Sequence, residues 1–161
     1  IAKMEMGRTK DAMTENVEKI QGRKAVNIVP CDCFVQGEVR GFNHEKVMDK
    51  IEEIRGIFAQ EAQESGAKLN FNVTVNCKAY EMNTNDLPAK RYQSACEIVG
   101  VEPEFVETYG GSDFNILAEQ GMIGLVLSNA MNDVHSCKEY TSVADLVQST
   151  QIVTKIMQDN R

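Results

Sequence analysis

The chain of 161 residues is acidic, with a formal net charge of −7. It has no dense run of lysine or arginine, so nucleic acid is not an expected partner. Its apolar runs are far shorter than the roughly 20 residues that cross a bilayer, and no signal-like leader opens it. Its five cysteines, an odd number, do not suit a secreted disulfide framework. We therefore expect a cytoplasmic protein with no membrane partner.

The first 80 residues predict an antiparallel sheet with helices on one face, in two layers. Alternation of apolar and polar residues indicates strands, and apolar residues at steps of three and four indicate a helix. The elements expected are the end of a helix at 1–8, β-type runs at 16–20 and 25–29 joined by a turn at 21–24, a strand at 33–40, a helix at 45–65 ended by Gly66, and a strand at 69–80.

The second half has the sequence pattern of an α/β domain, with predicted helices and strands in alternation. A polar stretch at 81–88 reads as a linker, so we place the domain boundary between residues 1–84 and 85–161. The elements expected beyond it are a helix at 89–99 ended by Gly100, a strand at 104–108, a helix at 113–120 ended by Gly121, a buried strand at 122–127, and a last helix capped by Ser142.

A glycine pair in this half is a candidate binding element. Gly110 and Gly111 would let the backbone approach a ligand closely, and Ser112 with Asp113 would cap the next helix, leaving amide donors at the mouth of a site. A strand could then deliver His135 to that mouth as a candidate metal ligand. A lone histidine is more often a hydrogen-bonded structural residue, so both interpretations stand on spacing alone.

Arg40 is the second candidate. It ends its predicted strand on the face opposite Val39. The simpler interpretation is a solvated arginine at a sheet edge. The sharper one is a clamp for a carboxylate, because a planar guanidinium can hold a carboxylate in two places.

Four motifs, in order along nearly the whole chain, resemble the second half of the di-zinc exopeptidases. They are Asn27-Ile28-Val29-Pro30, Gly37-Glu38-Val39-Arg40, Gly110-Gly111-Ser112-Asp113, and His135 followed by Glu139 and Val143. The family includes peptidase T, carboxypeptidase G, acetylornithine deacetylase and succinyl-diaminopimelate desuccinylase. The opening Ile1-Ala2-Lys3-Met4, with Gly7-Arg8 and the stretch 14–16, is most similar to the peptidase T-like branch.

The resemblance implies roles for particular residues. Arg40 would hold the substrate carboxylate, Asn27 would reach toward the scissile bond, and His135 would be a zinc ligand. The implied substrate-binding residues are Asn27, Arg40, Gly110, Gly111 and Ser112. One departure from the family is Arg23, where a glycine is usual, which makes the turn that presents Asn27 less secure.

The resemblance also implies an architecture and an activity. Residues 1–84 would be an incomplete lid domain, which in the family often mediates homodimerisation, and residues 85–161 the last segment of a catalytic domain that binds two zinc ions. The general base and other ligands would lie upstream, so the chain is expected to be an inactive fragment of a metallopeptidase for short peptides, of the tripeptide aminopeptidase type. Alternatives are a deacylase of N-acyl amino acids on the same fold, or a non-catalytic dimerisation module.

Overall fold

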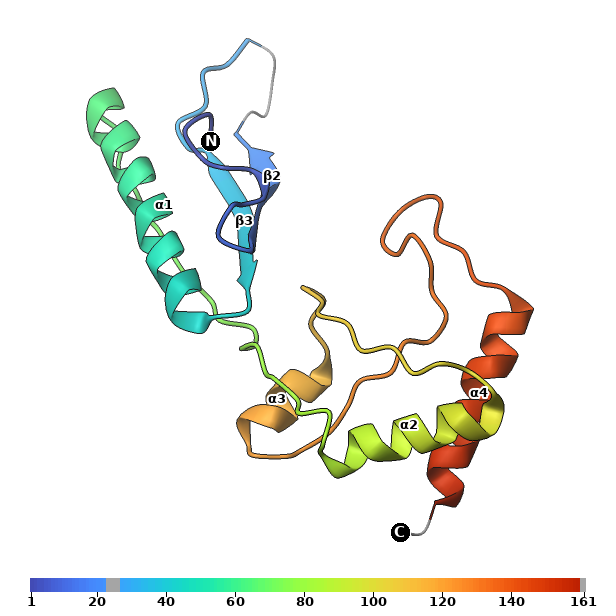
Figure 1. Cartoon of the computed structure of the whole chain (residues 1–161). Coiled ribbons are helices and arrows are strands. Elements are labelled where there is room, and N and C mark those ends of the chain that lie inside the picture. The colour runs from blue at the N-terminus through green and yellow to red at the C-terminus, as the bar shows by residue number, and fades with distance from the viewer. Residues whose placement is uncertain (23–26, 160–161) are drawn as a thin grey trace. The chain divides into compact units, whose positions relative to one another are not determined.

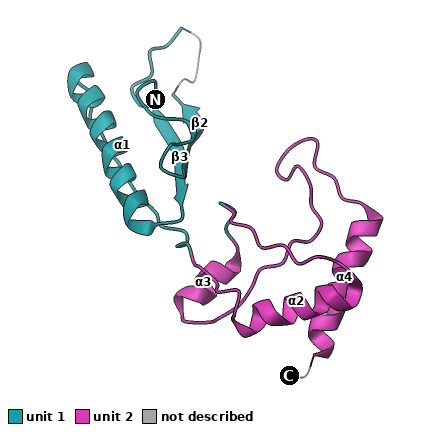
Figure 2. Cartoon of the chain, in the orientation of Figure 1, with its two compact units in different colours: residues 1–79, 109–111 teal, residues 80–108, 112–161 magenta. Residues whose placement is uncertain are grey.

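The computed structural model describes residues 1–22 and 27–159. The chain divides into two compact units, which are coloured separately in Figure 2. Unit 1 comprises Ile1–Ala79 with Tyr109–Gly111, and unit 2 comprises Tyr80–Thr108 with Ser112–Arg161. Each unit is described by itself.

Unit 1 is built on a three-stranded antiparallel sheet in the order β1-β2-β3. The strands are β1 (Gly7–Arg8), β2 (Met13–Gln21) and β3 (Phe34–Gly41). The prediction of a helix end at residues 1–8 is wrong: a turn closed by a hydrogen bond from the Met4 amide to the Ile1 carbonyl, 2.8 Å, leads into β1. That prediction rested on apolar spacing over only eight residues, too few to separate a helical period from a turn followed by a strand.

The helix α1 (His44–Ser65) packs against β3, as Figure 1 shows. Its start is capped by Asn43, whose side chain accepts a hydrogen bond from the Lys46 amide at 3.0 Å, and its end by Gly66 in the left-handed conformation, φ 68°. Among the described residues of this unit, Ile54 of α1 and Met13 of β2 are the buried apolar side chains. The predicted helix and its glycine stop are therefore confirmed.

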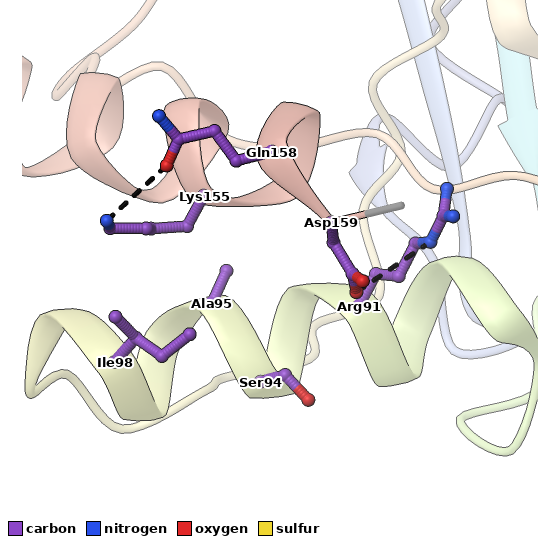
Figure 3. Close-up of a pocket in the computed structure, with 7 residues that line it drawn as sticks. All are labelled: Arg91, Ser94, Ala95, Ile98, Lys155, Gln158 and Asp159. Atoms are coloured by element: carbon purple, nitrogen blue, oxygen red, sulfur yellow. Dashed lines mark hydrogen bonds and ion pairs between the residues drawn. The ribbon is translucent and has the colours of Figure 1, made fainter. Parts of the chain in front are cut away.

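Unit 2 holds the other three helices: α2 (Leu87–Val99), α3 (Asp113–Glu119) and α4 (Val143–Gln158). Helices α2 and α4 pack against each other, and small side chains of α2 are buried (Ala89, Ala95 and Cys96). Figure 3 shows the hollow between them, where the Arg91 guanidinium approaches the Asp159 carboxylate at 3.9 Å. None of the predicted site residues lines this hollow.

Several predicted strands do not form in the part of the chain that the structure describes. The runs at 69–80, 104–108 and 122–127 join no ladder, and residues 27–29 lie in a turn region, while 25–26 fall outside the described residues. A strand is completed by hydrogen bonds to a neighbouring strand, and no such neighbour pairs with these runs among the described residues. The fold is thus mixed α/β, with one antiparallel sheet and helices, but the predicted parallel sheet is not formed.

Within the described ranges, no helix combines the length and the apolar character that crossing a membrane requires.

Candidate functional site

Arg40 lies near the end of β3, and its guanidinium is held by two partners in unit 1. One Nη donates to the Glu38 carboxylate at 2.9 Å, and the other donates to the main-chain carbonyl of Tyr109 at 3.2 Å. The hydrogen bond with Glu38 raises the pKa of Arg40, so its charge is permanent. The Arg40 side chain is about half exposed, at 46%, which leaves room for a further anion to approach it.

The Tyr109–Gly111 segment belongs to unit 1, in contact with the sheet residues around Arg40. The Tyr109 ring packs on Phe42 with centroids 4.6 Å apart, and the Arg8 guanidinium lies 5.2 Å from its centroid. Aromatic stacking and a cation–π contact together fix the ring, and with it the start of the glycine turn. The structure therefore brings Arg40 beside the predicted glycine turn, 69 residues away in sequence.

Gly111 has space for a side chain at its Cα. A Cβ there would lie 3.4 Å from the Cys77 sulfur, which is ordinary van der Waals contact, and Gly111 is not among the glycines with positive φ. Neither crowding by the described residues nor a left-handed backbone therefore requires glycine at this position. The expectation that Gly110 and Gly111 let the backbone approach a ligand closely stays a prediction.

Ser112 begins α3 in unit 2, and its amide is already used. It donates to the Asn115 side-chain oxygen at 2.9 Å, and the Ser112 hydroxyl lies 3.3 Å from the same atom. Ser112 is therefore the N-cap of this helix, as predicted, with the buried Asn115 as its partner, and the expectation that amide donors here face the mouth of a site stays a prediction. Asn115 was missed by the sequence reasoning, although its position three residues after an N-cap serine is the reciprocal half of a capping box.

His135 lies in an exposed loop of unit 2 rather than at the end of a strand. The loop is closed by paired main-chain hydrogen bonds between Asn132 and Tyr140, at 2.9 and 3.1 Å. His135 has a left-handed backbone, φ 63°, and its amide donates to the Glu139 carboxylate at 2.9 Å. A non-glycine residue held at positive φ is strained, and such strain is concentrated at functional sites. The exposed ring is free to bind a metal, and its role as a ligand stays a prediction.

Asn27 is exposed in a turn region, and Arg23 lies outside the described residues. Arg40 and the glycine turn belong to unit 1, whereas Ser112 and His135 belong to unit 2. Within the described residues, no three His, Cys, Asp or Glu side chains form a group that could hold a metal ion. A catalytic zinc needs about three protein ligands, so His135 with its described neighbours does not complete a zinc site.

Comparisons with known proteins agree on the fold. No family model matches the chain. Aminopeptidase PepT of Bacillus cereus is 25% identical with a TM-score of 0.78, and the match covers 98% of this chain and 42% of that one. A tripeptidase of Staphylococcus aureus is 23% identical with a TM-score of 0.85 over the same shares. The uncharacterised protein YqjE of Bacillus subtilis is 23% identical over 159 residues, 99% of this chain and 43% of YqjE.

The chain therefore has the fold of a segment of the peptidase T-like enzymes, as its ordered motifs predicted. It spans less than half the length of the relatives that it matches.

Proposed function

We propose that the chain contributes the substrate-carboxylate arm, and one zinc ligand, of a peptidase T-like metallopeptidase that hydrolyses short peptides. The observation that carries this proposal is Arg40, whose guanidinium is fixed by Glu38 and by the carbonyl that begins the glycine turn. The similarity to an aminopeptidase and a tripeptidase supports a peptide as the substrate.

Arg40 would act by position rather than by proton transfer. A guanidinium held by two other groups presents its remaining N–H donors in a fixed plane, which suits a carboxylate of the substrate. Binding that carboxylate would place the scissile amide at a set distance from the clamp and convert binding energy into orientation. Gly110 and Gly111 would contact the substrate main chain close to Arg40, with Ser112 and Asn27 as further contacts.

His135 would be the zinc ligand that the described residues contribute, and residues elsewhere in the enzyme would supply the others and the general base. A zinc pair in such enzymes activates water and polarises the scissile carbonyl. Zinc content measured by atomic absorption is expected to fall in His135→Ala of the protein made from the complete gene. A matched His44→Ala change, at the start of α1, should leave zinc content unchanged. Unaltered zinc binding by His135→Ala would remove His135 from the ligand set.

The alternative substrate is an N-acyl amino acid, because Arg40 recognises a carboxylate without selecting the group attached to it. Hydrolysis of trialanine and of acetylated amino acids by the protein from the complete gene, with zinc or cobalt present, separates the two. Peptide cleavage at a higher kcat/KM supports the peptidase. Faster release of acetate from acetylated amino acids would support a deacylase instead of a peptidase. Turnover of neither substrate would overturn both proposals.

We also propose a homodimer formed through unit 1. Strand β3 (Phe34–Gly41) is at the edge of the sheet, and its outer hydrogen-bonding groups pair with no strand among the described residues. A second copy could extend the sheet by pairing there. Light scattering of the unmutated protein should give twice the monomer mass. The Val35→Pro variant should give the monomer mass, because proline has no backbone N–H to donate to the ladder between the two copies. A monomer at high concentration before any mutation would contradict the dimer.

A further inference from the structure

We infer that Arg8 is a second carboxylate-binding residue, which acts with Arg40 on the carboxylate of the substrate. This inference rests on the proposed function and names a determinant of specificity within it. It follows from strand register, from shared contacts with Tyr109, and from the balance of charge around Arg40.

The sheet register sets Arg8 and Arg40 in one row. Arg8 of β1 is paired with Thr14 of β2, and Thr14 is paired with Arg40 of β3. Residues directly opposite in antiparallel strands project from the same face, so both arginines share a face with Thr14 between them. Their Cα atoms are on the order of 10 Å apart, two strand spacings.

Both arginines contact Tyr109 on that face. Arg8 lies over the ring at 5.2 Å from its centroid, and Arg40 donates to the main-chain carbonyl at 3.2 Å. Tyr109 immediately precedes Gly110 and Gly111. The two guanidinium groups therefore contact the same residue at the start of the glycine turn, one at its ring and the other at its carbonyl.

The charges around Arg40 explain why one guanidinium is not enough. Glu38 forms an ion pair with Arg40 at 2.9 Å, and Glu18 adds to the negative field that Arg40 experiences. A substrate carboxylate that approached Arg40 alone would meet a nearly neutral pair and then an additional acid. Among the described residues, Arg8 takes part in no ion pair with a carboxylate. Its charge is thus available to the anion, and it offsets the negative charges that Glu38 and Glu18 place around Arg40.

The opposite face of the sheet is not available for this purpose. Glu15, adjacent to Thr14 in β2, is buried, and Met13 on its other side contributes to the core beneath α1. The alternation along β2 therefore separates a packed face from the face that carries the arginine row.

The test measures binding without turnover. The protein made from the complete gene is stripped of metal with a chelator and titrated calorimetrically with trialanine and with trialanine amide, which lacks the terminal carboxylate. Wild type is expected to prefer trialanine. Arg8→Gln should bind trialanine about tenfold more weakly, the loss typical of a charge-assisted hydrogen bond, with binding of the amide unchanged. Arg8→Lys should recover part of that loss, because it restores the charge without the planar fork.

Arg55→Gln is the matched control, since Arg55 also lies over an aromatic ring, Phe71, at 5.0 Å, but on α1. It should change neither affinity. If Arg8→Gln weakens the binding of trialanine and of its amide equally, Arg8 acts only through Tyr109. If the variant keeps the full preference for trialanine, Arg8 has no role in binding the carboxylate. Either result overturns the inference while the proposed function stands. If wild type itself shows no preference for the carboxylate, the clamp fails and the inference fails with it.

Discussion

Glu15 is an unusual residue in this sheet. It is fully buried in β2 with 1% of its surface exposed, and neither carboxylate oxygen has a hydrogen-bond partner among the described residues. Burial raises its pKa, and the charges of Glu53 and Glu5 raise it further, whereas Lys50 of α1 lowers it. Lys50 is mainly engaged elsewhere, because its ammonium pairs with Glu53 at 2.8 Å. The ionised form of Glu15 is therefore poorly compensated in the folded state.

The raised pKa of Glu15 makes the stability of the folded chain depend on pH. A carboxyl whose pKa is higher in the folded than in the unfolded state binds protons more tightly when folded, so its favourable contribution is complete below its unfolded pKa, about 4.3. That contribution is lost as pH rises through the raised folded pKa of Glu15. The free energy of unfolding should therefore fall as pH rises from the unfolded pKa of Glu15 through its raised folded pKa. Urea denaturation followed by circular dichroism at a series of pH values measures this fall.

Glu15→Gln should remove this loss. The substitution keeps the shape of the side chain but carries no charge, so the free energy of unfolding at pH 7.5 should rise by about 1 kcal/mol or more, the scale of an uncompensated buried charged group. Glu18→Gln, on the same strand but exposed, is the control and should change stability by less than about 0.5 kcal/mol. Lower stability of Glu15→Gln at pH 7.5 would show that the carboxylate has a partner after all.

The pattern of residues predicted some features of the candidate site and not others. Arg40 could be placed at the end of a strand because alternation determines the face on which a side chain lies. The contact between Arg40 and Tyr109 could not be predicted from the sequence, because it joins residues 69 positions apart and depends on tertiary packing. The position of Arg8 on a strand could not be predicted for a different reason. Residues 1–8 have the apolar spacing of a helix end, and a strand of two residues is too short to show a period of its own.

At the scale of elements, helices were predicted well because their ends are signalled locally. Gly66 and Gly100 adopt the left-handed conformation at φ 68° and 79°, and Ser142 accepts a hydrogen bond from the Asp145 amide at 3.0 Å. Strands depend on a partner elsewhere in the fold. The alternation at 69–80 therefore predicted a strand that has no ladder among the described residues, even though Phe71 packs against Phe58 of α1 at 6.2 Å.

Two glycines distinguish the demands of strand and helix. A Cβ at Gly37 in β3 would lie 2.5 Å from the Asn16 carbonyl oxygen of the paired strand, whereas a Cβ at Gly56 in α1 would meet nothing within 4 Å. Gly37→Ala should lower the free energy of unfolding by about 1–3 kcal/mol, since the backbone of β2 must shift. Gly56→Ala should raise it by about 0.5–1 kcal/mol through helix propensity. Urea midpoints that moved in the same direction for both variants would contradict this account of the sheet.

At the scale of the whole molecule, the helix α4 has no buried residue. Its apolar stripe is exposed, with Val143 at 78% and Met157 at 79%, and Ile123 in the apolar run at 122–127 is 69% exposed. The described residues do not cover this stripe. Exposed apolar faces of this kind commonly mark surfaces of interaction.

The 161-residue chain should therefore bind a hydrophobic dye such as ANS, with increased fluorescence at neutral pH. Replacing Leu146 and Val147 of α4 with lysine should reduce the fluorescence while leaving the circular dichroism spectrum unchanged, because both are exposed at 43% and 51%. Thr150→Lys and Thr154→Lys on the same helix are a control with little apolar surface to lose. Fluorescence no higher than that of a folded monomeric control protein would contradict the exposure of these faces.

The proposed function depends above all on Arg40 holding the carboxylate of a short peptide. The most direct measurement is kcat/KM for trialanine and for trialanine amide, using the zinc-loaded protein from the complete gene and its Arg40→Gln variant. We predict that Arg40→Gln lowers kcat/KM for trialanine roughly 100-fold, the scale of about 3 kcal/mol for a charged hydrogen-bonding group, and barely changes that for the amide. Equal rates of wild type and Arg40→Gln on trialanine would contradict the claim.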